Sequence, residues 1–318
     1  MRSFAQAALT ISLTTALLAG CGGSQPSIGT PGAIPQAPAL AARTNSTNYK
    51  VVYSFGGPPD AGLPGGSLID VRGTLYGTTS AGGTYACGSP SGGCGTVFRI
   101  RLSGKEKVLY AFVGRGDGII PDASLLDVDG TFYGTTSGGG SYRACGYSSD
   151  YFPCGTVFSV TMGGTEKVLH SFGSKTDGID PVASLIDVNG TLYGTTSNGG
   201  AHKRCNGGCG TVFSITPSGT EKVLHSFGAK SDGTQPLASL IEVKGKLYGT
   251  TEYGGAYGLG TVFSITLSGR EKVLHSFDNG TDGTLPNAGL VDVDGTLYGT
   301  TLTGGEQLQQ RRQLRDGL

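Results

Sequence analysis

The chain has 318 residues, a formal net charge of zero and only 14% charged residues. It has no basic stripe that would neutralise phosphates, so the composition argues against nucleic acid as a partner. Glycine is abundant, at 58 residues, but it recurs at regular intervals among Val, Leu, Tyr and Phe, which indicates turns between strands and not disorder.

The first twenty residues are typical of an export signal. Arg2 precedes an apolar, helix-prone stretch, Phe4 to Leu18, that is too short to span a bilayer comfortably. The "LAGC" that follows resembles the bacterial lipobox, whose cysteine is lipidated and becomes the first mature residue. The resemblance implies a lipoprotein signal peptide over 1–20 and a Cys21 whose acyl chains anchor the protein to a membrane. The alternative is a chance cysteine after an ordinary secretory signal.

The expected location is the cell envelope, outside the cytoplasm. Gly22 follows the lipobox cysteine where an aspartate would favour retention, so the resemblance implies the outer membrane or the cell surface. Residues 21–49 are rich in Ser, Pro, Gly, Ala and Thr without periodicity. Such a segment cannot bury a core, and we expect a flexible linker that holds the folded domain away from the lipid.

From residue 50 to 305 one unit repeats. It begins with the strand-like "EKVLHSF", passes through "DGIDPVASLIDVNG" and "TLYGTTSNGG", and after a variable insert closes with "GTVFSIT". The phrase "GTLYGTT" and its relatives start 57, 60, 55 and 50 residues apart, so the unit is about 50–60 residues long. A fixed order at this period predicts a propeller or a solenoid. We count four complete units and a partial fifth.

Each unit is predicted to contain four strands. Asn189-Gly190 separates two β-prone runs, and Asn-Gly tolerates the positive φ angles of a tight hairpin turn, so the second and third strands should be adjacent and antiparallel. In "TVFSIT" both faces are apolar or small, as expected for a sheet covered on both sides. The sequence therefore predicts an all-β fold, a β-propeller of four-stranded units. A linear β-repeat stack is the alternative, because the period does not determine curvature.

These motifs carry a family resemblance. "GTLYGTTSNGG" followed by "GTVFSIT", with "DG" and "P" before "ASLIDV", resembles the GloVer (Gloeo/Verruco-type) tandem repeat of exported, surface-anchored bacterial proteins. The resemblance covers residues 50 to 305 and implies an extracytoplasmic β-repeat protein without an established reaction.

Six of the seven cysteines form three close pairs, each inside one insert between the third and fourth strands. An exported protein can form disulfides, and such a pair would rigidify an exposed loop. A metal site at His202, Cys205 and Cys209 is the competing interpretation, but it lacks a fourth ligand, so we expect disulfides and no metal or other cofactor. The disulfide candidates are Cys87, Cys94, Cys145, Cys154, Cys205 and Cys209.

Two kinds of polar residue recur in the units. Histidine occupies one position of the first strand in three units, where Tyr53 and Tyr110 stand in the earlier ones. A histidine ring near a propeller axis could bind a metal or an anion, but tyrosine does not replace a histidine ligand without loss, so packing is favoured. An Asp-Gly pair, as at Asp177, is best explained by a turn in which the carboxylate caps backbone amides, and a calcium loop would need more acidic ligands.

Catalytic motifs do not stand out, because the recurring carboxylates occur once per unit and an active site normally breaks repeat symmetry. Residues specific to one unit lie in the inserts, and exposed aromatic and basic loop residues are typical of recognition surfaces. The candidate recognition residues are Tyr85, Tyr142, Arg143, Tyr147, Tyr151, Phe152, His202, Lys203 and Arg204. Variable loops without a ligand remain the alternative.

We therefore expect a lipid-anchored, non-enzymatic binding scaffold for a surface glycan or a protein partner. Two alternatives remain: a propeller-type lyase or glycosidase, which would need a pair of unit-specific carboxylates converging in a central pocket, and a structural scaffold for envelope assembly.

Residues 306–318 depart from the repeat. Where the fifth unit should continue towards "GTVF", the chain reads "EQLQQRRQLRDGL". Synonymous codons exist for which the next reading frame of this stretch encodes Asn-Cys-Asn-Asn-Gly-Gly-Asn-Tyr-Gly-Thr-Val, which is an insert followed by the start of the missing strand. We interpret this tail as the product of a frameshift, which would leave an unpaired strand edge.

Overall fold

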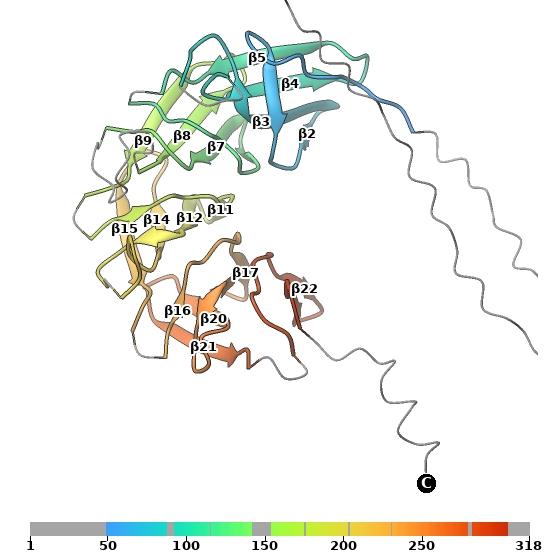
Figure 1. Cartoon of the computed structure of the whole chain (residues 1–318). Helices are drawn as coiled ribbons and strands as arrows, with labels where there is room; N and C mark the ends of the chain where they lie inside the picture. Colours follow the sequence, from blue (N-terminus) through green and yellow to red (C-terminus); the bar gives the residue numbers. More distant parts are fainter. Residues whose placement is uncertain are drawn as a thin grey trace, which may run out of the picture. The chain divides into compact units, whose positions relative to one another are not determined.

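The computed structural model describes residues 49–87, 92–114, 116–141, 154–174, 176–202, 204–229, 231–278 and 282–304 (Figure 1). The chain divides into two units, Met1–Tyr49 and Lys50–Leu318. The expected signal peptide, Cys21, nearly all of the linker and the tail after residue 304 lie outside the described residues. All regular structure within the described residues is β-strand, as predicted.

The part of the chain from Lys50 onward starts with a sheet in which β3 is central. The order is β2-β3-β4-β5, and β1 pairs with the far end of β3, so that Ala61 lies opposite Gly82. All pairs are antiparallel. The strands are β1 (Ala61–Pro64), β2 (Ile69–Val71), β3 (Thr74–Gly82), β4 (Thr96–Arg101) and β5 (Glu106–Ala111).

Three further four-stranded sheets repeat this order, and a two-stranded sheet follows them. The second sheet contains β6 (Leu126–Val128), β7 (Thr131–Thr136), β8 (Thr156–Thr161) and β9 (Glu166–Ser171). The third contains β11 (Ile186–Val188), β12 (Thr191–Thr196), β14 (Thr211–Ile215) and β15 (Glu221–Ser226). The fourth contains β17 (Ile241–Val243), β18 (Lys246–Thr251), β20 (Thr261–Thr266) and β21 (Glu271–Ser276). The last contains β22 (Val291–Val293) and β23 (Thr296–Tyr298).

Two short antiparallel pairs accompany the third and fourth sheets. They are β10 (Gly178–Ile179) with β13 (Asn198–Gly199), and β16 (Gly233–Thr234) with β19 (Tyr253–Gly254). Each joins the Asp-Gly segment of a repeat to the beginning of its insert.

The predicted hairpin between the second and third strands of the unit is confirmed. Asn189 and Gly190 have φ angles of 53° and 78°, so both central residues of the turn adopt the left-handed conformation that a two-residue hairpin needs. The turn sets Val188 opposite Thr191 and Ile186 opposite Tyr193.

The sheets are offset from the sequence unit by one strand. Each "EKVLHS" strand pairs with the preceding "GTVF" strand, as Ser214 of β14 does with Lys222 of β15, and not with the strands that follow it. The physical reason is the connection length: Ser218-Gly219 makes a tight turn from β14 to β15, whereas the longer "DG…P" segment leads to the next sheet. The outer strand that we placed first in each unit thus closes the sheet before it.

The repeated "LYGTT" is explained by the packing within and between sheets. Gly194 lies opposite Phe213, and a Cβ at Gly194 would come within 2.6 Å of the Phe213 ring. Both threonines are buried: the Thr195 hydroxyl donates to the Ala238 carbonyl at 3.2 Å, and the Thr196 hydroxyl lies 2.9 Å from that of Thr211. Glycine admits the aromatic ring, and the threonines hold the neighbouring segments.

Aromatic pairs join one sheet to the next. The phenylalanine that ends each outer strand packs edge-on against the phenylalanine of the next "GTVF" strand, as in Phe172 with Phe213, whose centroids are 5.0 Å apart. The same contact joins Phe112 to Phe158, also at 5.0 Å. Each main core cluster therefore mixes residues of two sheets, so the interior sheets are covered on both faces, as predicted.

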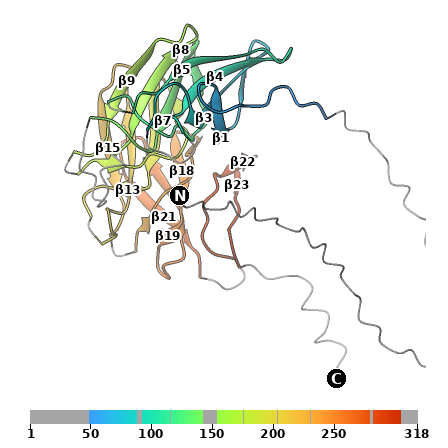
Figure 2. The same ribbon diagram turned by 45° about the horizontal axis from the view of Figure 1, so that its top comes forward.

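From Lys50 onward, the sheets follow one another like the blades of a propeller (Figures 1 and 2). The short strands β11, β17 and β22 contact one another in turn, while β9, β15 and β21 lie on the outside. The predicted propeller of four-stranded units is confirmed, and the ring is not closed: β2 of the first sheet and β22 of the last lie at the two ends of the arc in Figure 1.

Candidate functional site

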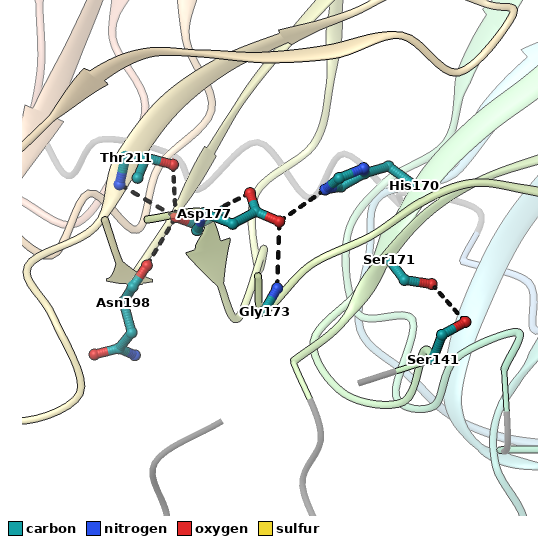
Figure 3. A network of polar contacts seen from close by, with 9 residues as sticks. Ser141, His170, Ser171, Gly173, Asp177, Asn198 and Thr211 are labelled. Atoms are coloured by element: carbon teal, nitrogen blue, oxygen red, sulfur yellow. Dashed lines mark hydrogen bonds and ion pairs between the residues drawn. The ribbon is translucent and has the colours of Figure 1, made fainter. Parts of the chain in front are cut away.

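The Asp-Gly turn of the third unit receives several polar contacts. Asp177 Oδ2 lies 2.9 Å from His170 Nε2 and accepts a hydrogen bond from the Gly173 amide at 3.3 Å (Figure 3). Asp177 Oδ1 accepts one from the Gly178 amide at 2.8 Å. The carboxylate caps backbone amides, and it also binds a side chain of the outer strand β9. The His170 ring packs edge-on against Phe172, with centroids 4.8 Å apart.

This contact recurs in every unit. His225 Nε2 is 2.9 Å from Asp232, and in the second unit the Tyr110 hydroxyl donates to Asp117 at 2.6 Å. Tyr53 donates to Asp60 in the first unit at 2.8 Å. The histidines lie on the outermost strands, so they do not form a ring near the axis as the metal interpretation assumed. Tyrosine and histidine can exchange because both present a polar atom to the same aspartate.

A glutamate of the following sheet lies beside two of these histidine–aspartate pairs. Glu221, the first residue of β15, has its ligating oxygen within 4.8 Å of those of His170 and Asp177. Glu271 has the same place beside His225 and Asp232. In both glutamates Oε1 is shielded from solvent and has no hydrogen-bond partner among the described residues.

Burial is the largest cause of a raised pKa in these glutamates and in Glu166, which has the same place beside Tyr110 and Asp117. Burial, and then the nearby Asp117, raises the pKa of Glu166 to about 7. Burial and Asp177 do the same for Glu221, where His170 acts in the opposite direction, and its pKa is also about 7. The sequence motif gave no signal for this arrangement, since the "E" of "EKVLHSF" reads as an ordinary exposed residue at the beginning of a strand.

The inserts between the third and fourth strands carry the predicted recognition residues. Tyr85 is 51% exposed. His202 and Arg204 are also exposed, and Arg204 Nη1 donates to the Ala229 carbonyl at 3.3 Å. Tyr142, Arg143, Tyr147, Tyr151, Phe152 and Lys203 lie outside the described residues.

Two exposed tyrosines were not among the predicted recognition residues. Tyr253 and Tyr257 are 40% and 64% exposed and belong to the short fourth insert. The signal was present, since "EYGGAYGLG" is specific to one unit, but the prediction covered only the longer inserts that contain cysteine. Every insert joins the third strand to the fourth in its unit, so the inserts open at the same edge of their sheets and form one rim.

Disulfides close a short loop in two of these inserts, just before the fourth strand. Cys87 pairs with Cys94 and Cys205 with Cys209, with Cα atoms 5.1 and 5.2 Å apart. Cys154 is also disulfide-bonded, while Cys145 lies outside the described residues.

The carboxylates that recur on the innermost strands are used by the hairpins. Asp70 and Asp127 each accept a hydrogen bond from the glycine amide three residues later, at 2.9 and 3.0 Å, and Glu242 accepts one from Gly245. Their side chains stabilise turns, which accounts for one such residue per unit.

A hollow of about 680 Å³ lies beside these hairpin turns, between the first two sheets. It is lined by Arg72 and Asp129, which belong to two successive hairpin turns. These turns lie at the ends of the strands that are opposite to the inserts. It is therefore separate from the insert rim.

Comparison with known proteins identifies the repeat. A family model described as a Gloeobacter/Verrucomicrobia repeat matches residues 85–310. The chain belongs to this family. The resemblance inferred from the motifs is therefore confirmed for the Gloeobacter/Verrucomicrobia repeat. Comparison with curated proteins found no match.

Solved structures with a similar arrangement were also found. Bacteroides ovatus xyloglucan PUL GH43B is 17% identical, with 72% of this chain and 42% of that chain covered and a TM-score of 0.37. A Bacteroides thetaiotaomicron protein of unknown function is 14% identical, with 78% and 55% covered and a TM-score of 0.46. The arabinofuranosidase CtGH43 of Clostridium thermocellum is 14% identical, with 76% and 81% covered and a TM-score of 0.39.

The repeat chain thus spans about half the length of the first two structures. In the part of the chain that the structure describes, no helix has the length and apolar character needed to cross a bilayer.

Proposed function

We propose that this repeat protein is a non-enzymatic binding scaffold outside the cytoplasm, whose inserts recognise a surface glycan. The observation that carries the proposal is the set of exposed tyrosines on inserts that share one rim: Tyr85, Tyr253 and Tyr257. A tyrosine ring has a flat apolar face and a polar hydroxyl, and it loses little conformational entropy when a ligand orders it. Sugar rings offer the matching apolar faces and hydroxyl groups.

The division of labour within the repeat supports recognition at the inserts. The residues that recur in every unit have structural partners: Asp127 stabilises a hairpin, Thr195 joins neighbouring sheets and Asp177 caps amides. The inserts differ between units, while strands hold both of their ends and disulfides cross-link some of them. A rigid scaffold that presents variable loops is a common design for binding.

Export and lipid anchoring belong to the same proposal. The lipobox-like "LAGC" supports an acylated Cys21 at the cell envelope, with the segment before residue 50 as a linker. The disulfides of the inserts suit an oxidising compartment. Metabolic labelling with a palmitate analogue, compared between the natural chain and Cys21→Ala, tests this part. Absence of label on the natural chain would contradict it.

The binding role is tested with immobilised bacterial surface polysaccharides. The full chain should bind at least one of them, and Tyr85→Ala and Tyr257→Ala should each weaken that binding several-fold. Tyr49→Ala is the matched control, since Tyr49 is 87% exposed but lies outside the inserts. Equal binding by all variants, or capture of protein alone, would contradict a glycan site on the inserts. Release of shortened oligosaccharides from a bound glycan would show an enzyme instead.

A further inference from the structure

The two complete His–Asp–Glu clusters bring three metal-ligating groups together at a junction between sheets. In the first, His170 and Asp177 come from one repeat and Glu221 from the following sheet, with ligand atoms all within 4.8 Å of one another. His170 Nε2 and Asp177 Oδ2 are already 2.9 Å apart. One nitrogen and two carboxylate oxygens in such a group are a ligand set that zinc accepts.

The glutamate points to a missing partner. Oε1 of Glu221 and Oε1 of Glu271 are each shielded from solvent without a hydrogen bond among the described residues. Oε1 of Glu106 and of Glu166 are in the same state, but there a tyrosine stands in place of the histidine, so only the histidine clusters offer a third ligand beside the free oxygen. A buried polar oxygen without a partner costs free energy, and native structures normally satisfy it. A cation held between this oxygen, the aspartate and the histidine would supply the interaction.

The cluster is also accessible. The His170 side chain is 21% exposed while that of Asp177 is 4% exposed, so the aspartate lies beneath a histidine that solvent can reach. The second cluster has nearly the same values, 21% for His225 and 6% for Asp232. An ion can enter from the histidine side, and three protein ligands leave a position for water.

We propose that His170, Asp177 and Glu221 form one zinc site, and that His225, Asp232 and Glu271 form a second. Each ion joins the outer strand of one sheet to that of the next and stabilises their junction. These sites lie on the outer strands, apart from the inserts, so the inference does not depend on the proposed glycan binding.

The chain contains its own control for these sites. In the second unit Tyr110 replaces the histidine while Asp117 and Glu166 keep their places. A phenol hydroxyl that donates to the aspartate at 2.6 Å presents a proton where a metal ligand would present a lone pair. We therefore expect no zinc at that junction. For His275 and Asp282, no third ligand completes a cluster within the described residues.

The test is zinc stoichiometry and affinity in the untagged, oxidised full chain after treatment with a chelator. Calorimetric titration with zinc should show two sites. His170→Tyr should remove one, His225→Tyr should remove the other, and the double variant should retain neither. These variants are expected to fold, because tyrosine occupies the same position beside an aspartate in two units of this chain. Cooperative melting of each variant checks that they do.

A gain of function makes the test stricter. Tyr110→His places a histidine beside Asp117 and Glu166, and it should raise the stoichiometry from two to three. Glu221→Gln should weaken the first site at least tenfold while leaving the second unchanged. Zinc should also raise the melting temperature of the natural chain and not that of the double variant.

Two results would overturn the inference. One is no zinc binding by the natural chain beyond that of the folded double variant. The other is binding that persists unchanged in His170→Tyr and His225→Tyr, which would assign the metal to other groups.

Discussion

Replacing Glu166 by glutamine should make the stability of the protein less dependent on pH. Burial, and then the charge of Asp117, raises the pKa of Glu166 from 4.5 to about 7. The folded protein therefore holds a proton that the unfolded chain has released, over the range between about pH 4.5 and pH 7. Because the folded state binds more protons, the free energy of unfolding falls as the pH rises through this range, and the favourable contribution is lost above it.

The magnitude follows from the difference between the two pKa values. At about 1.4 kcal/mol per pH unit the full difference would correspond to about 3 kcal/mol. Glu166 is only half-buried, and solvent screens such a group, so we expect about 1 kcal/mol. Glu166 also forms a side-chain hydrogen bond with Tyr110. Glutamine fills nearly the same volume and can form a hydrogen bond there, but it does not titrate.

Urea unfolding at about pH 5 and about pH 8 measures this effect. From the lower to the higher pH, the free energy of unfolding of the natural chain should fall by about 1 kcal/mol more than that of Glu166→Gln. Glu252→Gln is the matched control, because it removes one carboxylate from an insert and touches none of the clusters between sheets. If Glu166→Gln changed stability equally at both pH values, the assigned protonation of this junction would be wrong.

Three further predictions concern packing, cross-links and the last strand. Phe158→Ala should lower the free energy of unfolding by about 3–5 kcal/mol in urea titrations, since this fully buried ring packs against Phe112. Replacing both Cys205 and Cys209 by serine should cost at most about 2 kcal/mol in urea titrations, because the loop that their disulfide closes is short. Tyr298→Lys should reduce self-association in sedimentation, because Tyr298 is 57% exposed on β23, whose only strand partner within the described residues is β22.

The fold could be predicted because its determinants are local and repeated. Asn189-Gly190 encodes a hairpin by its permitted φ angles alone, and the short Ser218-Gly219 connection encodes the next pairing. Five copies of one phrase then remove the ambiguity that a single short strand would leave. The predicted unit placed each outer strand first, although this short connection pairs that strand with the sheet before it.

The clusters between sheets could not be predicted from the same motifs. His170 and Asp177 are seven residues apart, and their contact depends on how the outer strand turns towards the next sheet. Glu221 reaches them from a strand 44 residues beyond Asp177, through the stacking of two sheets. Periodicity shows that such residues recur, but only the stacking shows that residues of different repeats meet.

The exchange of tyrosine and histidine at one position links structure to function in this repeat. Tyr110 donates its hydroxyl proton to Asp117, while His170 offers a nitrogen to the same kind of aspartate and glutamate. A repeat protein can therefore vary the chemistry of a junction without changing its packing, because the phenylalanine pairs beside it stay the same. The sequence of the inserts varies in the same way, and exposed residues such as Tyr85 and Tyr257 lie in loops whose two ends are fixed by strands. The constant residues build the stack, so a change of residue where the units differ leaves the packing intact.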